Sequence, residues 1–238
     1  MPNARSVVLV LWTVVWAAIG VISAIVDPRG RLYLWLAQRH WARQILCLAG
    51  VKLSVRGAEN ADWKRSYVIV VNHQSQLDIP VLMNGLPGAI RFLAKRSLFF
   101  IPLFGWSMWL AGFIPVDRGR SRRARASIRR AAERIRQGPS LVVFPEGTRS
   151  PNGEVQRFKS GAFVLAIRSG VPILPLAVRG TFEVVPRHRL AVRPGPVELI
   201  VGRPIETSGK SMADKEDLRR AAHEAVIEMH RTGEPSAL

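Results

Sequence analysis

Apolar positions along this chain fall into one long block near the start and a series of short runs after it. The long block covers residues 6–26, in which 21 consecutive side chains carry no charge. As a helix it would be about 31 Å long, close to the ~30 Å hydrocarbon core of a bilayer. It ends without the small-residue pattern that precedes signal-peptide cleavage. We therefore predict a retained membrane helix, and the pattern leaves open whether it spans the bilayer or turns back.

The stretch 31–49 spaces its apolar side chains at helical intervals, with Leu34, Ile45 and Leu48 near one stripe. Such a stripe is typical either of a helix that lies in the membrane surface or of an ordinary core helix. Arg5 alone precedes the long apolar block, whereas several arginines follow it: Arg29, Arg31, Arg39 and Arg43. By the positive-inside rule, we expect residues 1–50 to be helices associated with the inner (cytoplasmic) membrane and the rest of the chain to lie on its cytoplasmic side.

After residue 50, short apolar runs alternate with helical patterns, as in a soluble α/β domain. Short apolar or alternating runs predict strands at 51–55, 67–71, 90–95, 112–116, 141–144, 190–192 and 197–201. Helical spacing predicts helices at 78–83, 120–137, 160–169 and 214–231. The run 171–178 is also extended, but Pro172 and Pro175 favour an edge position or an irregular strand. We expect one α/β domain at 51–238, with a central mixed sheet flanked by helices.

Composition narrows the classes of function that fit. With 238 residues, 48% of them hydrophobic, the chain can bury one sizeable core. Its formal charge of +18 calls for an anionic partner, which could be nucleic acid, anionic lipid or a phosphorylated substrate. The most basic stretch, 120–137, has no aromatic side chain to stack on bases, which favours a solvated or lipid-facing surface. The single cysteine, Cys47, excludes an intramolecular disulfide and is expected to pack among apolar neighbours.

The chemistry is centred on residues 72–78, NHQSQLD, which directly follow the strand predicted at 67–71. Positions five apart on one helix lie about 140° from each other, so His73 and Asp78 can meet only across a bend. We place His73 in the loop after the strand and Asp78 in the first turn of the next helix, where the macrodipole favours a carboxylate. Asp78 could then hold one ring nitrogen and leave the other as a general base. The same pattern also fits a histidine at a strand end with an unrelated aspartate.

Other predicted strands end in polar signatures too. Lys95 ends the run 90–95, and Asp117-Arg118 follow the run 112–116. The run 141–144 leads into Pro-Glu-Gly-Thr-Arg at 145–149. A glycine allows close backbone approach, and a guanidinium binds phosphate oxygens through two parallel hydrogen bonds. On this stretch alone, Glu146 and Arg149 could instead form a local ion pair.

Taken together, these stretches resemble the glycerolipid acyltransferase family. Its first block, Asn-His-x-x-x-x-Asp, corresponds to residues 72–78, and its third, Phe-Pro-Glu-Gly-Thr-Arg, to 144–149. Residues 112–118 and 171–175 resemble its second and fourth blocks, in the same order, except that Pro115 stands where members often carry another apolar residue. Within the family, the chain looks most like bacterial 1-acyl-glycerol-3-phosphate acyltransferases, which are small, membrane-bound and begin with a hydrophobic helical element.

The resemblance implies transfer of a fatty acyl group from acyl-CoA or acyl carrier protein to the free hydroxyl of 1-acyl-glycerol-3-phosphate (lysophosphatidate), forming phosphatidic acid. His73 would be the base and Asp78 would orient it, with neither a metal nor a further cofactor. The acceptor phosphate is expected at Arg149, Lys95 and Arg118. Glu146 would position the loop, and Gly147 and Thr148 would contact substrate. Backbone N–H groups near Gly147 are candidates to hold the oxyanion.

Two alternatives remain open at this point. The acceptor could be another lysolipid, such as a lyso-aminolipid or a different lysophospholipid, because the blocks describe the chemistry better than the acceptor. From another class, a membrane-tethered nucleic-acid-binding protein would explain the charge of +18. That alternative leaves the residues around His73 and Glu146 without a purpose. We therefore expect membrane lipids as partners and no nucleic acid.

Overall fold

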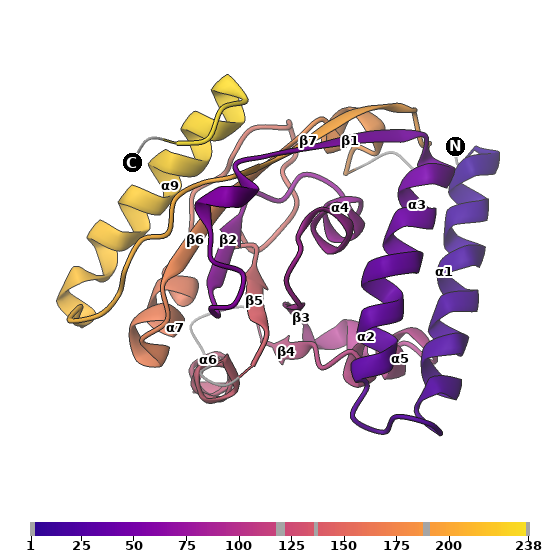
Figure 1. Cartoon of the computed structure of the whole chain (residues 1–238), viewed down its shortest axis with the longest axis horizontal. Coiled ribbons are helices and arrows are strands. Elements are labelled where there is room, and N and C mark those ends of the chain that lie inside the picture. Colours follow the sequence, from indigo (N-terminus) through magenta and orange to yellow (C-terminus); the bar gives the residue numbers. More distant parts are fainter. Residues whose placement is uncertain (1–2, 118–121, 136–137, 188–190, 237–238) are drawn as a thin grey trace.

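The computed structural model describes residues 3–117, 122–135, 138–187 and 191–236, without the side chains of residues 122–125. The described residues form a seven-stranded sheet with helices on both faces (Figure 1). The strands are β1 (Val51–Arg56), β2 (Val68–Val71), β3 (Ile90–Lys95), β4 (Ile114–Val116), β5 (Ser140–Val143), β6 (Ile173–Arg179) and β7 (Gly195–Val201). Their order across the sheet is β1-β7-β6-β2-β5-β3-β4. The β6–β7 pair is antiparallel and every other neighbouring pair is parallel, so the sheet is mixed, as predicted.

Helices cover the sheet in two layers. One layer contains α3 (Ala42–Ala49) and α4 (Asp78–Gly85), with α1 (Ala4–Ser23), α2 (Arg31–Leu36) and α5 (Phe104–Leu110) outside them (Figure 1). The other layer contains α6 (Arg122–Ile135), α7 (Gly161–Ser169) and α9 (Lys215–Thr232). Shorter elements are a π-helical turn at Ala37–Trp41, the helix α8 (Thr181–Val184) and 3₁₀ turns at Ala58–Asn60, Arg96–Phe100 and Met212–Asp214.

The central strand β2 shows why its sequence is a continuous apolar run. Ile69 and Val71 belong to the core beneath α3 and α4, whereas Val68 and Val70 belong to the core beneath α6, α7 and α9. All four side chains are fully buried. A strand covered on both faces has no solvent face to mark with polar residues. Its carboxyl end, where His73 follows, therefore emerges between two packed layers.

The strand β6 corrects one prediction. Residues 171–178 were expected to form an edge strand or an irregular strand because of their prolines, but β6 is a regularly paired strand in the interior, between β7 and β2. The carbonyl of Pro175 accepts a hydrogen bond from Gly202 N (2.9 Å), just past the end of β7. The N–H and C=O of a strand residue point to the same side, so the missing donor faces a break in the antiparallel pairing, between the ladder of β7 and the bridge from Ile173 to Ile205, and the proline is tolerated there.

The strand predicted at 190–192 is a second correction. Residue 190 lies outside the described residues, and Ala191 and Val192 are not in a strand. Val192 instead pairs with a side chain, since its carbonyl accepts from Asn3 Nδ2 (2.8 Å) and its N–H donates to Asn3 Oδ1 (3.3 Å). The side chain of Asn3 thus makes the two hydrogen bonds that a neighbouring strand would otherwise make to Val192. The same Asn3 oxygen caps α1 by accepting from Ser6 N.

The N-terminal helix α1 packs along the side of the domain. Its Gly20 leaves room for the ring of Tyr33, because a Cβ at Gly20 would lie 2.5 Å from that ring. In the turn between α1 and α2, Gly30 has a positive φ of 67°, and a Cβ at this position would collide with the backbone of Leu110 in α5. Within the described part of the chain, α1 is the helix whose length and mean hydropathy of 2.3 would allow it to cross a membrane, and 22% of its apolar window is buried.

Residues 31–49 bury much of their apolar stripe in the protein core, but Leu48 of that stripe is exposed. Tyr33, Leu34, Ile45 and Leu46 are buried in the same core as β2, so the main apolar face of this segment points into the protein. Cys47 was expected to pack, but it is exposed because it lies on the opposite side of α3 from that face. The prediction that residues 1–50 form a unit separate from 51–238 stays a prediction.

Candidate active site

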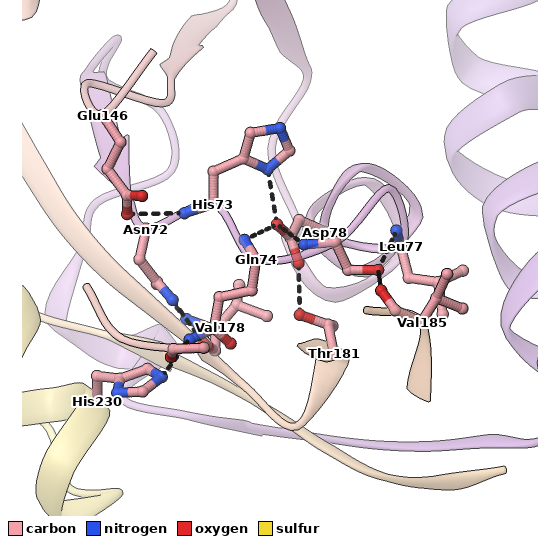
Figure 2. A network of polar contacts seen from close by, with 12 residues as sticks. Asn72, His73, Gln74, Leu77, Asp78, Glu146, Val178, Thr181, Val185 and His230 are labelled. Carbon is pink, nitrogen blue, oxygen red and sulfur yellow. Dashed lines mark hydrogen bonds and ion pairs between the residues drawn. The ribbon is translucent and has the colours of Figure 1, made fainter. Parts of the chain in front are cut away.

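His73 and Asp78 meet across the bend between β2 and α4. Nδ1 of His73 lies 2.8 Å from Oδ2 of Asp78, and Asp78 is the first residue of α4 (Figure 2). This is the geometry expected from their spacing. An ionised carboxylate can only accept hydrogen bonds, so Nδ1 carries the proton and Nε2 has the free lone pair. In Figure 2, Nε2 points away from the polar network, and it has no hydrogen bond to another described residue.

Asp78 is fully buried and is held by three further donors. The backbone N–H groups of Gln74 (2.8 Å) and Ser75 (3.0 Å) donate to Oδ2, and the hydroxyl of Thr181 donates to Oδ1 (2.6 Å). These bonds, together with the start of α4, compensate the loss of solvation of the buried carboxylate. Asp78 is therefore held rigidly, and it fixes the imidazole of His73 in turn.

The third sequence block packs directly on His73. The ring of Phe144 stacks on the imidazole with centroids 4.0 Å apart, because β5 lies beside β2 in the sheet. Oε1 of Glu146 accepts the backbone N–H of His73 (3.0 Å), and Ser150 N donates to the His73 carbonyl (2.7 Å). The loop 144–150 thus holds the His73 backbone at both its N–H and its C=O. Its geometry fits the positioning role that the sequence suggested for Glu146.

Glu146 has an unusual electrostatic environment. Burial raises the pKa of its carboxyl to about 8, although the backbone N–H groups of His73 and Gln156 donate to it. Its second oxygen, Oε2, is buried and has no hydrogen-bond partner among the described residues. Glu146 and Arg149 do not form an ion pair, so the local-pair alternative is not the arrangement observed. At neutral pH, Glu146 is mostly a neutral acid.

Gly147 and Thr148 complete the turn of this loop. Gly147 has a φ of 78°, and a Cβ there would lie 2.5 Å from Nζ of Lys159, so the position favours glycine for two reasons. The Gly147 N–H donates to the carbonyl of Phe144 (3.0 Å). It is therefore already engaged, which argues against the idea that it holds an oxyanion. Thr148 is exposed at the tip of the turn.

The predicted phosphate-binding cations are placed differently from one another. Arg149 is half-buried and adjoins Ser150, which contacts the His73 backbone. Lys95 is exposed at the end of β3, the second strand from β2, roughly 10 Å away across the sheet. Arg118 lies outside the described residues. Just before it, Asp117 forms an ion pair with Arg96 (2.9 Å) that joins the ends of β4 and β3.

Several contributors were missed by the sequence analysis. Asn72, which had no derived role, uses its side chain to join β2 to β6: Nδ2 donates to the Val178 carbonyl and Oδ1 accepts from Val178 N, both at 2.8 Å. Gln74 contacts Gly153 and, at 2.7 Å, Nε2 of His230 in α9 (Figure 2). Thr181 follows the apolar run 171–178 much as His73 follows 67–71. The expectation of an edge or irregular strand for that run hid this signal.

Ser75 is not arranged as a nucleophile. Its hydroxyl donates to the carbonyl of Val185 (2.9 Å) and accepts from Leu77 N (3.2 Å). Both contacts shape the turn between His73 and α4. Among the described residues, no group of three or more His, Cys, Asp or Glu side chains is arranged to hold a metal ion.

Known proteins have sequences similar to this chain. The chain is 34% identical over 184 residues to "1-acyl-sn-glycerol-3-phosphate acyltransferase LPAT1, chloroplastic" from Arabidopsis thaliana, which covers 76% of this chain and 51% of the plant protein. It is 29% identical over 219 residues to the 1-acyl-sn-glycerol-3-phosphate acyltransferase of Pseudomonas aeruginosa, covering 90% and 84%. The chain thus spans about half the length of the plant relative and most of the bacterial one.

A solved structure has the same fold. The crystal structure of the 1-acyl-sn-glycerophosphate (LPA) acyltransferase PlsC from Thermotoga maritima superposes with a TM-score of 0.74 at 29% identity, covering 94% of this chain and 95% of that one. The profile of the family described as Acyltransferase matches residues 52–179, from β1 to the end of β6 and including His73, Asp78 and Glu146. The chain therefore belongs to the Acyltransferase family.

Proposed function

We propose that this protein transfers a fatty acyl group from an acyl thioester to the free hydroxyl of 1-acyl-glycerol-3-phosphate, forming phosphatidic acid. The observation that carries the proposal is the 2.8 Å contact between His73 Nδ1 and a fully buried Asp78, with Nε2 directed away from the network. Relatives named 1-acyl-sn-glycerol-3-phosphate acyltransferases, at 29–36% identity, support this choice of acceptor.

The proposed reaction needs one base and no protein nucleophile. Nε2 of His73 takes the proton from the acceptor hydroxyl as its oxygen attacks the thioester carbonyl carbon. The imidazolium that forms is stabilised by Asp78. When the tetrahedral intermediate collapses, the carbon–sulfur bond breaks and the leaving thiolate receives the proton from His73. The donor, acyl-CoA or acyl carrier protein, is a second substrate, and no cofactor enters.

Membrane association is part of the proposal. Large apolar side chains are exposed along α1, including Val10 (64%) and Leu11 (61%), and on the neighbouring turn and helix, including Phe100 (76%) and Trp106 (54%). Such a surface fits the hydrocarbon of a lipid leaflet better than water. We place it on the inner membrane with the active site on the cytoplasmic side, in line with the arginines that follow α1.

The test of the reaction is release of free thiol from acyl-CoA, and separately from acyl carrier protein, by purified protein with lysophosphatidate added or withheld. We expect lysophosphatidate-dependent release and a product with the mass of phosphatidic acid. His73→Ala should abolish it. Release that depends instead on a lyso-aminolipid or another lysophospholipid would show that this other lipid is the acceptor. No thiol release with any acceptor would refute the proposal.

The membrane surface has its own test. Val10→Lys together with Leu11→Lys should abolish co-sedimentation with phosphatidylglycerol vesicles, because both positions are exposed and the change leaves the core alone. Thiol release in detergent should be retained. Unchanged co-sedimentation would show that the exposed face of α1 does not bind lipid.

A further inference from the structure

Residues 180–187 tie the candidate base to Arg149. Thr181 donates to Asp78, and the carbonyl of Val185 accepts from Ser75 (Figure 2). The segment then reaches Arg187, whose Nη1 donates to the backbone carbonyl of Arg149 (3.0 Å). Three hydrogen bonds therefore fix this segment against the first and third sequence blocks. Arg187 is held beside Arg149 in the same framework that positions His73.

Among the described residues, the two arginines lack a carboxylate partner. Some other arginines of the domain are paired, such as Arg96 with Asp117 and Arg179 with Glu198, but neither Arg149 nor Arg187 forms an ion pair with a described residue. Both are partly buried. Burial and the nearby charge of Arg187 lower the pKa of Arg149, as expected for two cations held close together.

The carboxylates close to this pair are already committed. Asp78 accepts four hydrogen bonds from His73, Gln74, Ser75 and Thr181. Glu146 is mostly neutral at pH 7, because burial raises its pKa to about 8. Asp78 partly compensates the charge of Arg149, but the two guanidinium groups still repel each other and are stabilised when an anionic ligand binds both.

We infer that Arg187, which lies outside all four sequence blocks, is a second arginine of the acceptor-phosphate site and binds the phosphomonoester together with Arg149. This inference rests on the proposed function. A phosphomonoester carries about −1.5 to −2 charges and three strong acceptor oxygens near neutral pH, which two guanidinium forks can satisfy. Since Ser150, next to Arg149, contacts the His73 backbone, a phosphate bound here holds the acceptor beside the base.

The experiment compares Michaelis constants for the two substrates in Arg187→Ala and Arg187→Lys. We expect Arg187→Ala to raise the KM for lysophosphatidate about 10- to 100-fold, the range for loss of charge-assisted hydrogen bonds, with kcat within about twofold. The KM for the acyl donor should not change. Arg187→Lys keeps the charge but not the fork, so its KM for lysophosphatidate should lie between those of the wild type and Arg187→Ala.

The matched control is Arg203→Ala. Arg203 is exposed just after the end of β7. Because β7 runs antiparallel to β6, Arg203 lies beside the amino ends of the parallel strands, whereas His73 lies at their carboxyl ends. The Arg203→Ala variant removes the same charge from the protein, and its KM values for both substrates should equal those of the wild type. An equal rise in Arg203→Ala would mean that net charge, and not a phosphate site, controls acceptor binding.

Other outcomes separate the inference from the proposed function. If the wild type uses lysophosphatidate and Arg187→Ala has the wild-type KM for it, the inference is wrong and the function stands. A rise in the donor KM would assign Arg187 to the donor, and a fall in kcat with both KM values unchanged would assign it a structural role; either result overturns the inference. If both arginines bind one phosphate, adding Arg187→Ala to Arg149→Ala should have a smaller effect than Arg187→Ala has alone.

Discussion

The hydroxyl of Thr181 donates a 2.6 Å hydrogen bond to Oδ1 of Asp78, joining residues 103 positions apart in the chain. The other carboxylate oxygen of Asp78 holds the imidazole of His73. Thr181 thus restrains the carboxylate that restrains the base. It lies at the start of α8, directly after the strand β6, and does not itself contact the imidazole.

Replacing Thr181 by valine keeps the shape of the side chain and removes the donor. We expect kcat to fall about tenfold, the scale of one hydrogen bond to a charged group, with both KM values within about twofold. Thr181→Ser keeps the hydroxyl and should retain most of the activity. Steady-state kinetics of the two variants distinguish the causes, since a loss in Thr181→Ser with none in Thr181→Val would point to packing of the methyl group instead.

Asp78→Asn tests the charge beside His73. The backbone N–H groups of Gln74 and Ser75 keep an oxygen at the Oδ2 position, so the amide oxygen can still accept from Nδ1, but a neutral amide no longer stabilises the imidazolium that forms during the reaction. We expect kcat to fall about 100-fold or more, within the range that general-base catalysis contributes. Single-turnover acyl transfer measures this. Combining Asp78→Asn with His73→Ala should cause little further loss, and additive losses would contradict a shared role.

Asn72 is expected to act through stability. It is fully buried, and alanine there would leave both the N–H and the C=O of Val178 without their 2.8 Å partners. The free energy of unfolding should fall by about 2–4 kcal/mol, as for two buried groups left unsatisfied. Urea unfolding in detergent measures it. The exposed Asn84 provides the control, since Asn84→Ala should change stability by only about 0.5 kcal/mol.

The raised pKa of Glu146 predicts an unusual dependence of the free energy of unfolding on pH. Its pKa rises from the ordinary 4.5 to about 8 on folding, so between these values the folded protein binds the proton more tightly than the unfolded chain does. Its contribution is therefore fully present below about pH 4.5 and is lost as pH rises to about 8. Glu146→Gln cannot ionise and should escape this loss.

The comparison is urea unfolding of wild type and Glu146→Gln at pH 5.5 and pH 8.5. Relative to wild type, the variant should gain about 1–4 kcal/mol between the two pH values, because each pKa unit corresponds to about 1.4 kcal/mol. Parallel pH profiles would show that Glu146 ionises normally in the folded protein. Activity of Glu146→Gln at pH 7 should be largely retained if the neutral acid is the functional form.

Much of the fold could be predicted from the sequence because local patterns encode it. The run at residues 67–71 predicted a buried strand, and β2 is covered on both faces. A carboxylate before a short apolar helix placed Asp78 at the start of α4, where it is found. These features depend on neighbours within a few residues. A spacing of five also implied the bend that lets His73 reach Asp78.

Predictions failed or stayed open where the pattern had two meanings. The prolines of the run 171–178 suggested an edge or irregular strand, yet β6 is interior because its one missing donor can face a break in the neighbouring ladder. The apolar stripe of residues 31–49 fits a membrane surface and a protein core. Part of it packs into the core beside β2, and Leu48 is exposed. In both cases the partners that decide the packing lie far away in sequence.

By itself, the sequence determined the strands that carry chemistry, the meeting of His73 with Asp78, and the family, because these depend on short-range spacing and ordered motifs. Only the tertiary structure decided which distant groups complete the site. It brought Thr181 to Asp78, Asn72 to Val178 and Arg187 to Arg149. No local pattern specifies such contacts, since they follow from the order of strands in the sheet, and that order is set by how both hydrophobic cores pack.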